Sequence, residues 1–162
     1  MTASTSVAEW PANDRMKTIL VPVDFSPVTA RVVEQAAALA QSFSGALWLL
    51  HVAAPDPDFV GYETGPDEVR QQVAHEMRDT HRQLQEEAAR LRGRGIDTTA
   101  LQVQGPTVET ILREAERLRA DLIVLGSHGH GALHRALLGT VSEGVLHRSA
   151  RPVLILPARA AR

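Results

Sequence analysis

Apolar residues along this chain occur in two alternating patterns: short continuous runs, and longer stretches with helical spacing. Five runs are short and apolar enough to be buried strands of a sheet covered on both faces. They cover residues 17–24, 46–53, 97–103, 121–126 and 152–157. The third run alternates apolar and polar residues, which is typical of an edge or half-covered strand.

The stretches between these runs carry apolar residues three or four positions apart and predict four helices. The first follows the first strand, and the others cover 67–92, 107–119 and about 140–149. In the first helix, Ser26 is placed to cap the N-terminus, Pro27 to take the first position and Gly45 to end it. Fully apolar strands alternating with helices predict a single-domain α/β fold, a doubly wound, five-stranded parallel sheet with helices on both faces.

Length and composition are consistent with one ordinary globular domain. The chain has 162 residues and is 44% hydrophobic, enough for a single core. We expect the domain to span 16–157, with a flexible N-terminal tail over 1–15 and a short C-terminal tail over 158–162. Because the net charge is only −2, a nucleic-acid partner is not expected.

The sequence lacks the residues for cysteine chemistry and the segments for secretion or membrane insertion. There is no cysteine, so disulfides, thiolate catalysis and cysteine-ligated metals are excluded. The first residues do not resemble a secretory signal, and no run reaches the ~18 apolar residues of a membrane span. We therefore expect a cytoplasmic protein with no membrane association.

The most unusual stretch connects the fourth strand to the last helix. It reads GSHGHGALHRALLG over residues 126–139, whereas such loops usually have about 2–6 residues. A connection this long more often serves a ligand than chain topology. In parallel sheets, ligands bind beyond the carboxyl ends of strands, where strand order reverses. Asp24, which ends the first strand, belongs to the same edge.

Spacing alone leaves two interpretations of this loop open. Glycines let backbone N–H groups approach a phosphate, and Gly139-Thr140 opens a helix whose N-terminus favours anions. The hydroxyls of Thr140 and Ser142 would be further donors. Alternatively, Thr140 and Glu143 form a capping box that satisfies the helix N-terminus, and the loop is only a turn. Neither a Walker loop nor a G-x-G-x-x-G after the first strand is present to decide.

The histidines of this loop make a metal site conceivable. His128, His130 and His134 are close in sequence, but a zinc site needs three or four ligands and no nearby acidic residue or cysteine completes one. We predict polar loop residues beside a phosphate, and no metal held by the protein. His51 and His147 lie in apolar segments and are expected to be hydrogen-bonded structural residues.

Four segments together resemble the universal stress protein family. They are KTILVPVDFS, LWLLHV, DLIVLGSHG and GTVSEGVLHRSARPVLILP, and they extend over nearly the whole expected domain. The family's nucleotide motif, G-x2-G-x9-G-[S/T], is matched by Gly126, Gly129, Gly139 and Thr140 after the correct strand. The resemblance is to the ATP-binding branch, whose fold is Rossmann-like.

The resemblance implies a stress-response protein that binds ATP, or ADP or AMP, with Mg²⁺ bridging phosphate oxygens. Asp24 would contact the ribose hydroxyls or the adenine edge, although an Asx turn ahead of Ser26 is an alternative role. Val52 would offer backbone groups to adenine. The implied nucleotide-binding set is Pro22, Val23, Asp24, Val52, Gly126, Ser127, His128, Gly129, His130, Gly139, Thr140, Val141 and Ser142.

Two positions depart from the family pattern. Many members carry arginine or lysine where this chain has His130, which predicts a weaker and more pH-dependent attraction for phosphate. Gly144 replaces a larger residue in the last helix and should soften that helix by roughly 1 kcal/mol relative to alanine.

The sequence favours binding over catalysis. Phosphoryl transfer needs a positioned base or a charge clamp, and the motif region offers only Asp24, Glu143 and Arg135. We predict no catalytic residues and at most slow ATP turnover. Two alternatives are an interaction protein of the same fold that binds no nucleotide, and an ATPase or phosphotransferase.

The last strand bears on assembly. Residues 153–156 are wholly apolar, and such an edge strand needs to be paired or covered. Members of the resembled family commonly pair this strand with its symmetry mate, so a homodimer is expected. The sequence does not identify a partner protein.

Overall fold

The computed structural model describes residues 16–53, 67–127 and 138–157. Along these ranges the elements are β1 (Thr18–Pro22), α1 (Thr29–Phe43), β2 (Ala46–Ala53), α2 (Asp67–Gly93), β3 (Thr98–Gln104), α3 (Thr107–Arg117), β4 (Leu122–Gly126), α4 (Thr140–Arg148) and β5 (Val153–Leu156). This is the predicted succession, with bounds that agree to within two residues. No helix in these ranges is both long and apolar enough to cross a membrane.

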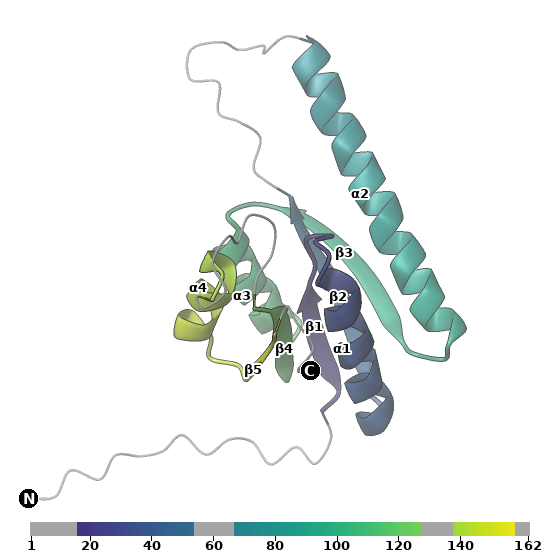
Figure 1. Cartoon of the computed structure of the whole chain (residues 1–162), viewed down its shortest axis with the longest axis vertical. Helices are drawn as coiled ribbons and strands as arrows, with labels where there is room; N and C mark the ends of the chain where they lie inside the picture. Colours follow the sequence, from purple (N-terminus) through teal and green to yellow (C-terminus); the bar gives the residue numbers. More distant parts are fainter. Residues whose placement is uncertain (1–15, 54–66, 128–137, 158–162) are drawn as a thin grey trace, which may run out of the picture.

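The strands form one parallel sheet in the order β3-β2-β1-β4-β5. In Figure 1, α1 and α2 cover one face of this sheet and α3 and α4 cover the other. The doubly wound α/β fold predicted from the apolar pattern is therefore confirmed. β3 lies at one edge, as its alternating sequence predicts, and β5 lies at the other.

The strand order reverses between β1 and β4. From β1 the chain proceeds outward to β2 and β3, and then crosses back to place β4 on the other side of β1. The connection leaving β1 leads to α1 on one face, whereas the one leaving β4 leads to α4 on the opposite face. Diverging connections open a crevice at the carboxyl ends of such strands.

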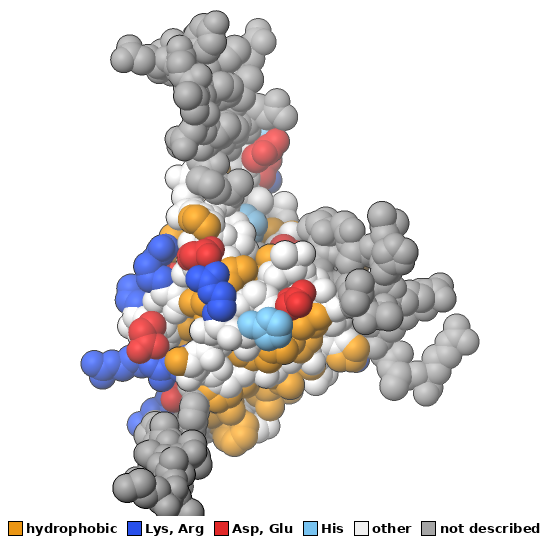
Figure 2. All heavy atoms as spheres, turned by 90° about the vertical axis from the view of Figure 1, so that its left-hand side faces the viewer, with side chains coloured by type: hydrophobic (Ala, Val, Ile, Leu, Met, Phe, Trp, Pro, Cys, Tyr) orange, Lys and Arg blue, Asp and Glu red, His pale blue; other side chains and the backbone are white. Residues whose placement is uncertain are grey.

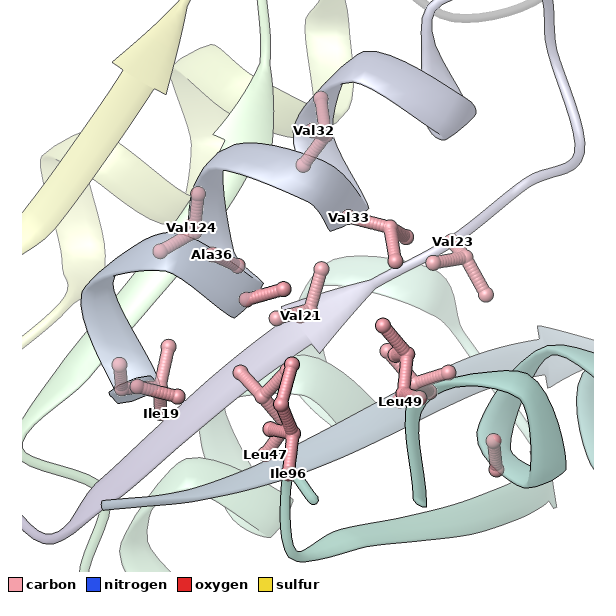
Figure 3. Close-up of a cluster of buried hydrophobic side chains, with 14 of the residues drawn as sticks. Ile19, Val21, Val23, Val32, Val33, Ala36, Leu47, Leu49, Ile96 and Val124 are labelled. Carbon is pink, nitrogen blue, oxygen red and sulfur yellow. The ribbon is translucent and has the colours of Figure 1, made fainter. Parts of the chain in front are cut away.

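The core beneath α1 and α2 holds β1 and β2 in position. Ile19 and Val21 of β1 and Leu47 and Leu49 of β2 are fully buried, and Figure 3 shows side chains of α1 lying over them. Leu84, Ala88 and Leu91 of α2 are also fully buried. Burial of this extent makes the sheet a rigid base for its carboxyl edge.

At the amino edge of the sheet, Asp121 joins two distant parts of the chain. Its Oδ2 accepts the N–H of Lys17 at 2.8 Å and the N–H of Thr18 at 2.9 Å. These bonds link the residue before β4 to the start of β1, so the two central strands are aligned by a carboxylate as well as by their own pairing.

Gly45 follows the end of α1, as predicted, and donates its N–H to Ala40 O at 2.9 Å. The left-handed residue there is Ser44, with φ 51°. Gly45 also lies against the segment entering β1, where an added Cβ would be 2.6 Å from the carbonyl oxygen of Met16. Glycine is needed here because two backbones approach closely.

Candidate functional site

A sharp turn follows β1 and fixes the carboxylate of Asp24. Asp24 Oδ1 accepts the N–H of Ser26 and the hydroxyl of Thr29, both at 3.0 Å. Phe25, between them in the chain, has φ 56°, a left-handed conformation that non-glycine residues rarely adopt. The Asx turn considered as an alternative for Asp24 is therefore present. It holds an exposed carboxylate at the edge of the sheet, which leaves a role in ligand binding open.

The same turn delays the start of α1. The N-cap is Val28 and the first helical residue is Thr29, so the prediction that Ser26 caps the helix and Pro27 is its first residue is wrong. The physical reason is that Asp24 binds the N–H of Ser26 first, and the chain completes a turn before helical geometry begins. Thr29, the second partner of Asp24, was not singled out in the sequence, although a hydroxyl at a helix start just after an aspartate is a recognisable pattern.

His51 reinforces the turn from β2. Its Nδ1 lies 2.9 Å from the carbonyl oxygen of Val23, and because a carbonyl only accepts, Nδ1 carries the proton. The ring also packs against Phe25, with centroids 5.2 Å apart. The structural role predicted for His51 is confirmed. His147, by contrast, is exposed near the end of α4.

Backbone hydrogen bonds hold together the two ends of the long loop after β4. Ser127 donates its N–H to Leu156 of β5 at 2.7 Å, and its carbonyl oxygen accepts the N–H of Gly139, also at 2.7 Å. Positions 128–137, which include His128, Gly129, His130 and His134, lie outside the described residues. The Ser127–Gly139 bond brings the first and third glycines of the motif together at the end of β4.

The helix that follows has a glycine as its N-cap. Gly139 has extended backbone angles, and Thr140 is already helical. A capping box needs Thr140 at the N-cap, so that interpretation is wrong by one residue. Glu143 donates its N–H to Gly139 O at 2.9 Å, which makes it the first N–H bonded within the helix. The N–H groups of residues 140–142 precede this bond, and groups in that position attract anions.

Ser142 differs from the expectation for its side chain. Its hydroxyl was expected to donate to phosphates, but it is buried and donates to the carbonyl oxygen of Gly126 at 2.7 Å. A hydroxyl has one proton to donate, so in this structure the side chain ties α4 to the end of β4. The backbone N–H of Ser142 remains among the three at the start of α4.

Gly144 also has a structural explanation. A Cβ at this position would be 3.0 Å from Val108 Cγ2 of α3. Glycine therefore lets α3 and α4 approach closely, which is a reason for its presence that helix propensity alone does not supply.

The sheet brings most of the predicted site residues to one edge. Because β2, β1 and β4 are neighbours, the segment after each strand opens onto the same edge: Val52 and Ala53 of β2, residues 22–24 after β1, and residues 126–127 of β4 with α4 beside them. Among the described side chains, those of 16–53, 74–127 and 138–157, no three His, Asp or Glu gather closely enough to hold a metal ion.

Comparison with known proteins identifies the family. The model of the universal stress protein family matches residues 16–157. The chain belongs to this family.

Several relatives of this universal stress protein match along nearly their whole length. One from Thermus aquaticus is 32% identical over 140 residues, which cover 86% of this chain and 98% of that protein. A solved structure from Methanocaldococcus jannaschii is 27% identical with a TM-score of 0.75, covering 90% of this chain and 99% of that one. A universal stress protein solved in complex with cAMP has a TM-score of 0.63 over 90% of this chain and 99% of its own. At 24% identity, its likeness establishes the shared fold.

Proposed function

We propose that this universal stress protein binds an adenine nucleotide, ATP foremost, in the crevice at the carboxyl ends of β2, β1 and β4. One observation carries the proposal: the start of α4, capped by Gly139, is held beside the end of β4 by the Ser127–Gly139 bond. This arrangement presents backbone N–H groups and the positive end of a helix dipole to an anion. The protein solved with cAMP indicates which class of ligand to test first.

The proposed roles follow from the chemistry of each strand end. The Asp24 carboxylate, fixed by Ser26 and Thr29, accepts hydrogen bonds from ribose hydroxyls. Backbone groups of Pro22, Val23 and Val52 meet the adenine. The N–H groups of residues 140–142, which precede the first hydrogen bond within α4, donate to the phosphates, with the Thr140 hydroxyl as a further donor. Mg²⁺ enters with the nucleotide and takes its ligands chiefly from phosphate oxygens and water, as this ion commonly does.

The same geometry favours binding without rapid turnover. Asp24 Oδ1 already accepts an N–H and a hydroxyl, and an oxygen held in this way suits a positioning role better than that of a general base. We propose a regulatory, stress-response function in which the protein reports nucleotide occupancy to a partner in the cytoplasm.

Two measurements on the purified protein test nucleotide binding. Mass spectrometry of small molecules released on denaturation should detect an adenine nucleotide, and calorimetry of stripped, refolded protein should show one ATP bound per chain. GTP is the control, because it carries the same phosphates and ribose. The proposal is contradicted if no nucleotide is released and ATP gives no heat. Turnover above about 1 s⁻¹, a typical enzyme rate, would favour the ATPase alternative.

We also propose a homodimer formed through β5. This strand is at the sheet edge and all four of its residues are only half-buried. Val141 and Leu146 of the neighbouring α4 are exposed, and Figure 2, which views the molecule from the side of α4, shows hydrophobic side chains gathered together on this face. An apolar edge strand of this kind is stabilised by pairing with another strand.

Ile155→Pro will separate the dimer without unfolding the chain. Pro152 and Leu156 direct their carbonyl groups to β4, so by strand alternation Ile155 directs its N–H to the open edge. Proline removes that N–H, and edge strands tolerate proline at such positions. Analytical ultracentrifugation should give a dimer for the wild type and a 17.6 kDa monomer for the variant, with unchanged circular dichroism. A monomeric wild type would refute the dimer.

A further inference from the structure

A cavity of about 420 Å³ lies between α1 and α2, at the carboxyl ends of β1 and β2. Its volume is within the range of small-molecule sites, roughly 300–1,000 Å³. Val33, Leu49 and Leu84 form a fully buried apolar floor. In Figure 3 the side chains of Val33 and Leu49 converge with that of Val23 beyond the end of β1. The described residues that line this cavity come from the α1–α2 side of the sheet and do not include β4 or α4.

A buried hydroxyl without a partner lies in the wall of this cavity. Ser26 lines the cavity and is only 5% exposed, and its Oγ has no hydrogen-bond partner among the residues that the structure describes. Buried polar groups are nearly always paired, and an unpaired one needs an explanation. The backbone of Ser26 is fully used by the Asx turn, through its N–H to Asp24 and its carbonyl oxygen to Thr29. Its side chain is therefore held in place with its hydrogen-bonding capacity available.

Phe25 supplies an aromatic wall at an energetic cost. Its side chain lines the cavity while its backbone has φ 56°, and the ring is supported by the ring of His51. Strained backbone conformations of this kind concentrate at ligand sites. The strain places an aromatic face beside the unpartnered hydroxyl.

The rim of the cavity favours a positive charge. Arg90 is there, with its Nη2 2.6 Å from Glu87 Oε1 and 2.7 Å from Glu34 Oε1, and Glu34 also pairs with Arg94 at 2.9 Å. The hydrogen bonds that Arg90 donates to Glu87 raise the pKa of Arg90. Glu86 also lines the cavity, and its ion pair with Arg82 is long, at 3.9 Å. Of the charged side chains that line the cavity, two are carboxylates, Glu86 and Glu87, and one is an arginine, so the lining carries a net negative charge.

We infer that this cavity is a second binding site, distinct from the proposed nucleotide crevice, for a small amphipathic amine. The apolar body lies against the buried floor and Phe25, a hydrogen-bonding group meets Ser26 Oγ, and the ammonium group lies toward Glu86 and Glu87. Thr29 lines the cavity and donates to Asp24, so an occupant also contacts a residue that positions that carboxylate.

Tryptamine is a suitable probe because it joins an aromatic body to an ammonium group. Titrated into ¹⁵N-labelled full-length protein, it should shift the amide resonances of Ser26, Ala30, Leu84 and Glu87 and saturate at one molecule per chain. Indole-3-acetate, with the same ring and a carboxylate, should bind at least tenfold more weakly. Absence of shifts at these residues, or equal binding of the two compounds, overturns the site. Shifts centred on residues 139–142 would place the probe in the nucleotide crevice and overturn it equally.

Two variants separate binding from folding. Ser26→Ala should raise the melting temperature of the free protein, because it removes an unpaired buried hydroxyl, and should lower tryptamine affinity several-fold. Glu86→Gln, on an exposed helix surface, should also lower that affinity several-fold, whereas Glu76→Gln, earlier on α2 and outside the cavity, should not. Unchanged tryptamine affinity in both Ser26→Ala and Glu86→Gln would refute the inference.

Discussion

Replacing Gly45 with alanine will lower the free energy of unfolding by about 2–3 kcal/mol, since overpacking typically costs 1–3 kcal/mol. The added Cβ would lie 2.6 Å from Met16 O and 3.2 Å from Lys17 O. Both are backbone atoms, and Lys17 O already accepts the N–H of Ala46 at 2.7 Å. No side chain can rotate to relieve the contact, so the start of β2 must move away from β1.

The measurement is thermal or urea unfolding, and the chain supplies a matched control. Gly93 has no atom within 4 Å of an added Cβ and closes α2. Gly93→Ala should therefore be neutral or stabilising by about 0.5 kcal/mol, because alanine has a higher helix propensity and lowers the conformational entropy of the unfolded chain. For a domain of this size, the Gly45 variant should melt about 5–10 °C lower. Equal melting temperatures for the two variants would show that the close approach is not rigid.

Asp24→Asn will weaken ATP binding by about tenfold or more, because a hydrogen bond to a charged group contributes about 1.5–3 kcal/mol. Asparagine retains an oxygen that can accept the N–H of Ser26 and the hydroxyl of Thr29, so the turn after β1 persists. The charge and the capacity to accept two ribose hydroxyls are lost. Asp24→Ala, which also removes the turn, should bind more weakly still and be less stable.

Calorimetry with a second nucleotide tests whether the lost affinity comes from a contact between Asp24 and the ribose. If Asp24 contacts the ribose, the Asn variant should lose less affinity for 2′-deoxyATP than for ATP, because one of the lost hydrogen bonds is absent from the deoxy ligand. Asp97→Asn is the control, as Asp97 is exposed and precedes β3 at the opposite edge of the sheet. Wild-type ATP affinity in Asp24→Asn would remove Asp24 from the proposed site.

The elements of this fold could be predicted because their apolar patterns are long and their periods differ. The start of the first helix was predicted wrongly because a nearby side chain accepts a hydrogen bond from the backbone at that boundary. Ser26-Pro27 has the composition of a helix start, yet the nearby Asp24 binds the N–H of Ser26 and α1 begins at Thr29. Such competition depends on distances between side chain and backbone, which residue spacing does not specify.

The candidate site was predictable to the extent that its residues follow strands. Asp24, Val52 and Gly126 are placed by the sheet, and the order of strands brings them to one edge. The functions of Ser142 and Gly144 could not be predicted in the same way, because each is set by packing between elements. Ser142 bonds the end of β4, and Gly144 faces Val108 of α3.

The position of β1 at the centre of the sheet has a consequence for synthesis of the protein. β1 leaves the ribosome first, but its neighbour β4 and the Asp121 carboxylate that binds Thr18 follow 103 residues later. At about 5–20 residues per second, a strand of the nascent chain waits roughly 5–20 s for this partner. During that interval one edge of β1 is exposed to other chains, and the proposed nucleotide crevice lacks the side that β4 and α4 form. We therefore expect nucleotide binding by a growing or truncated chain to be deferred until translation has passed the start of α4.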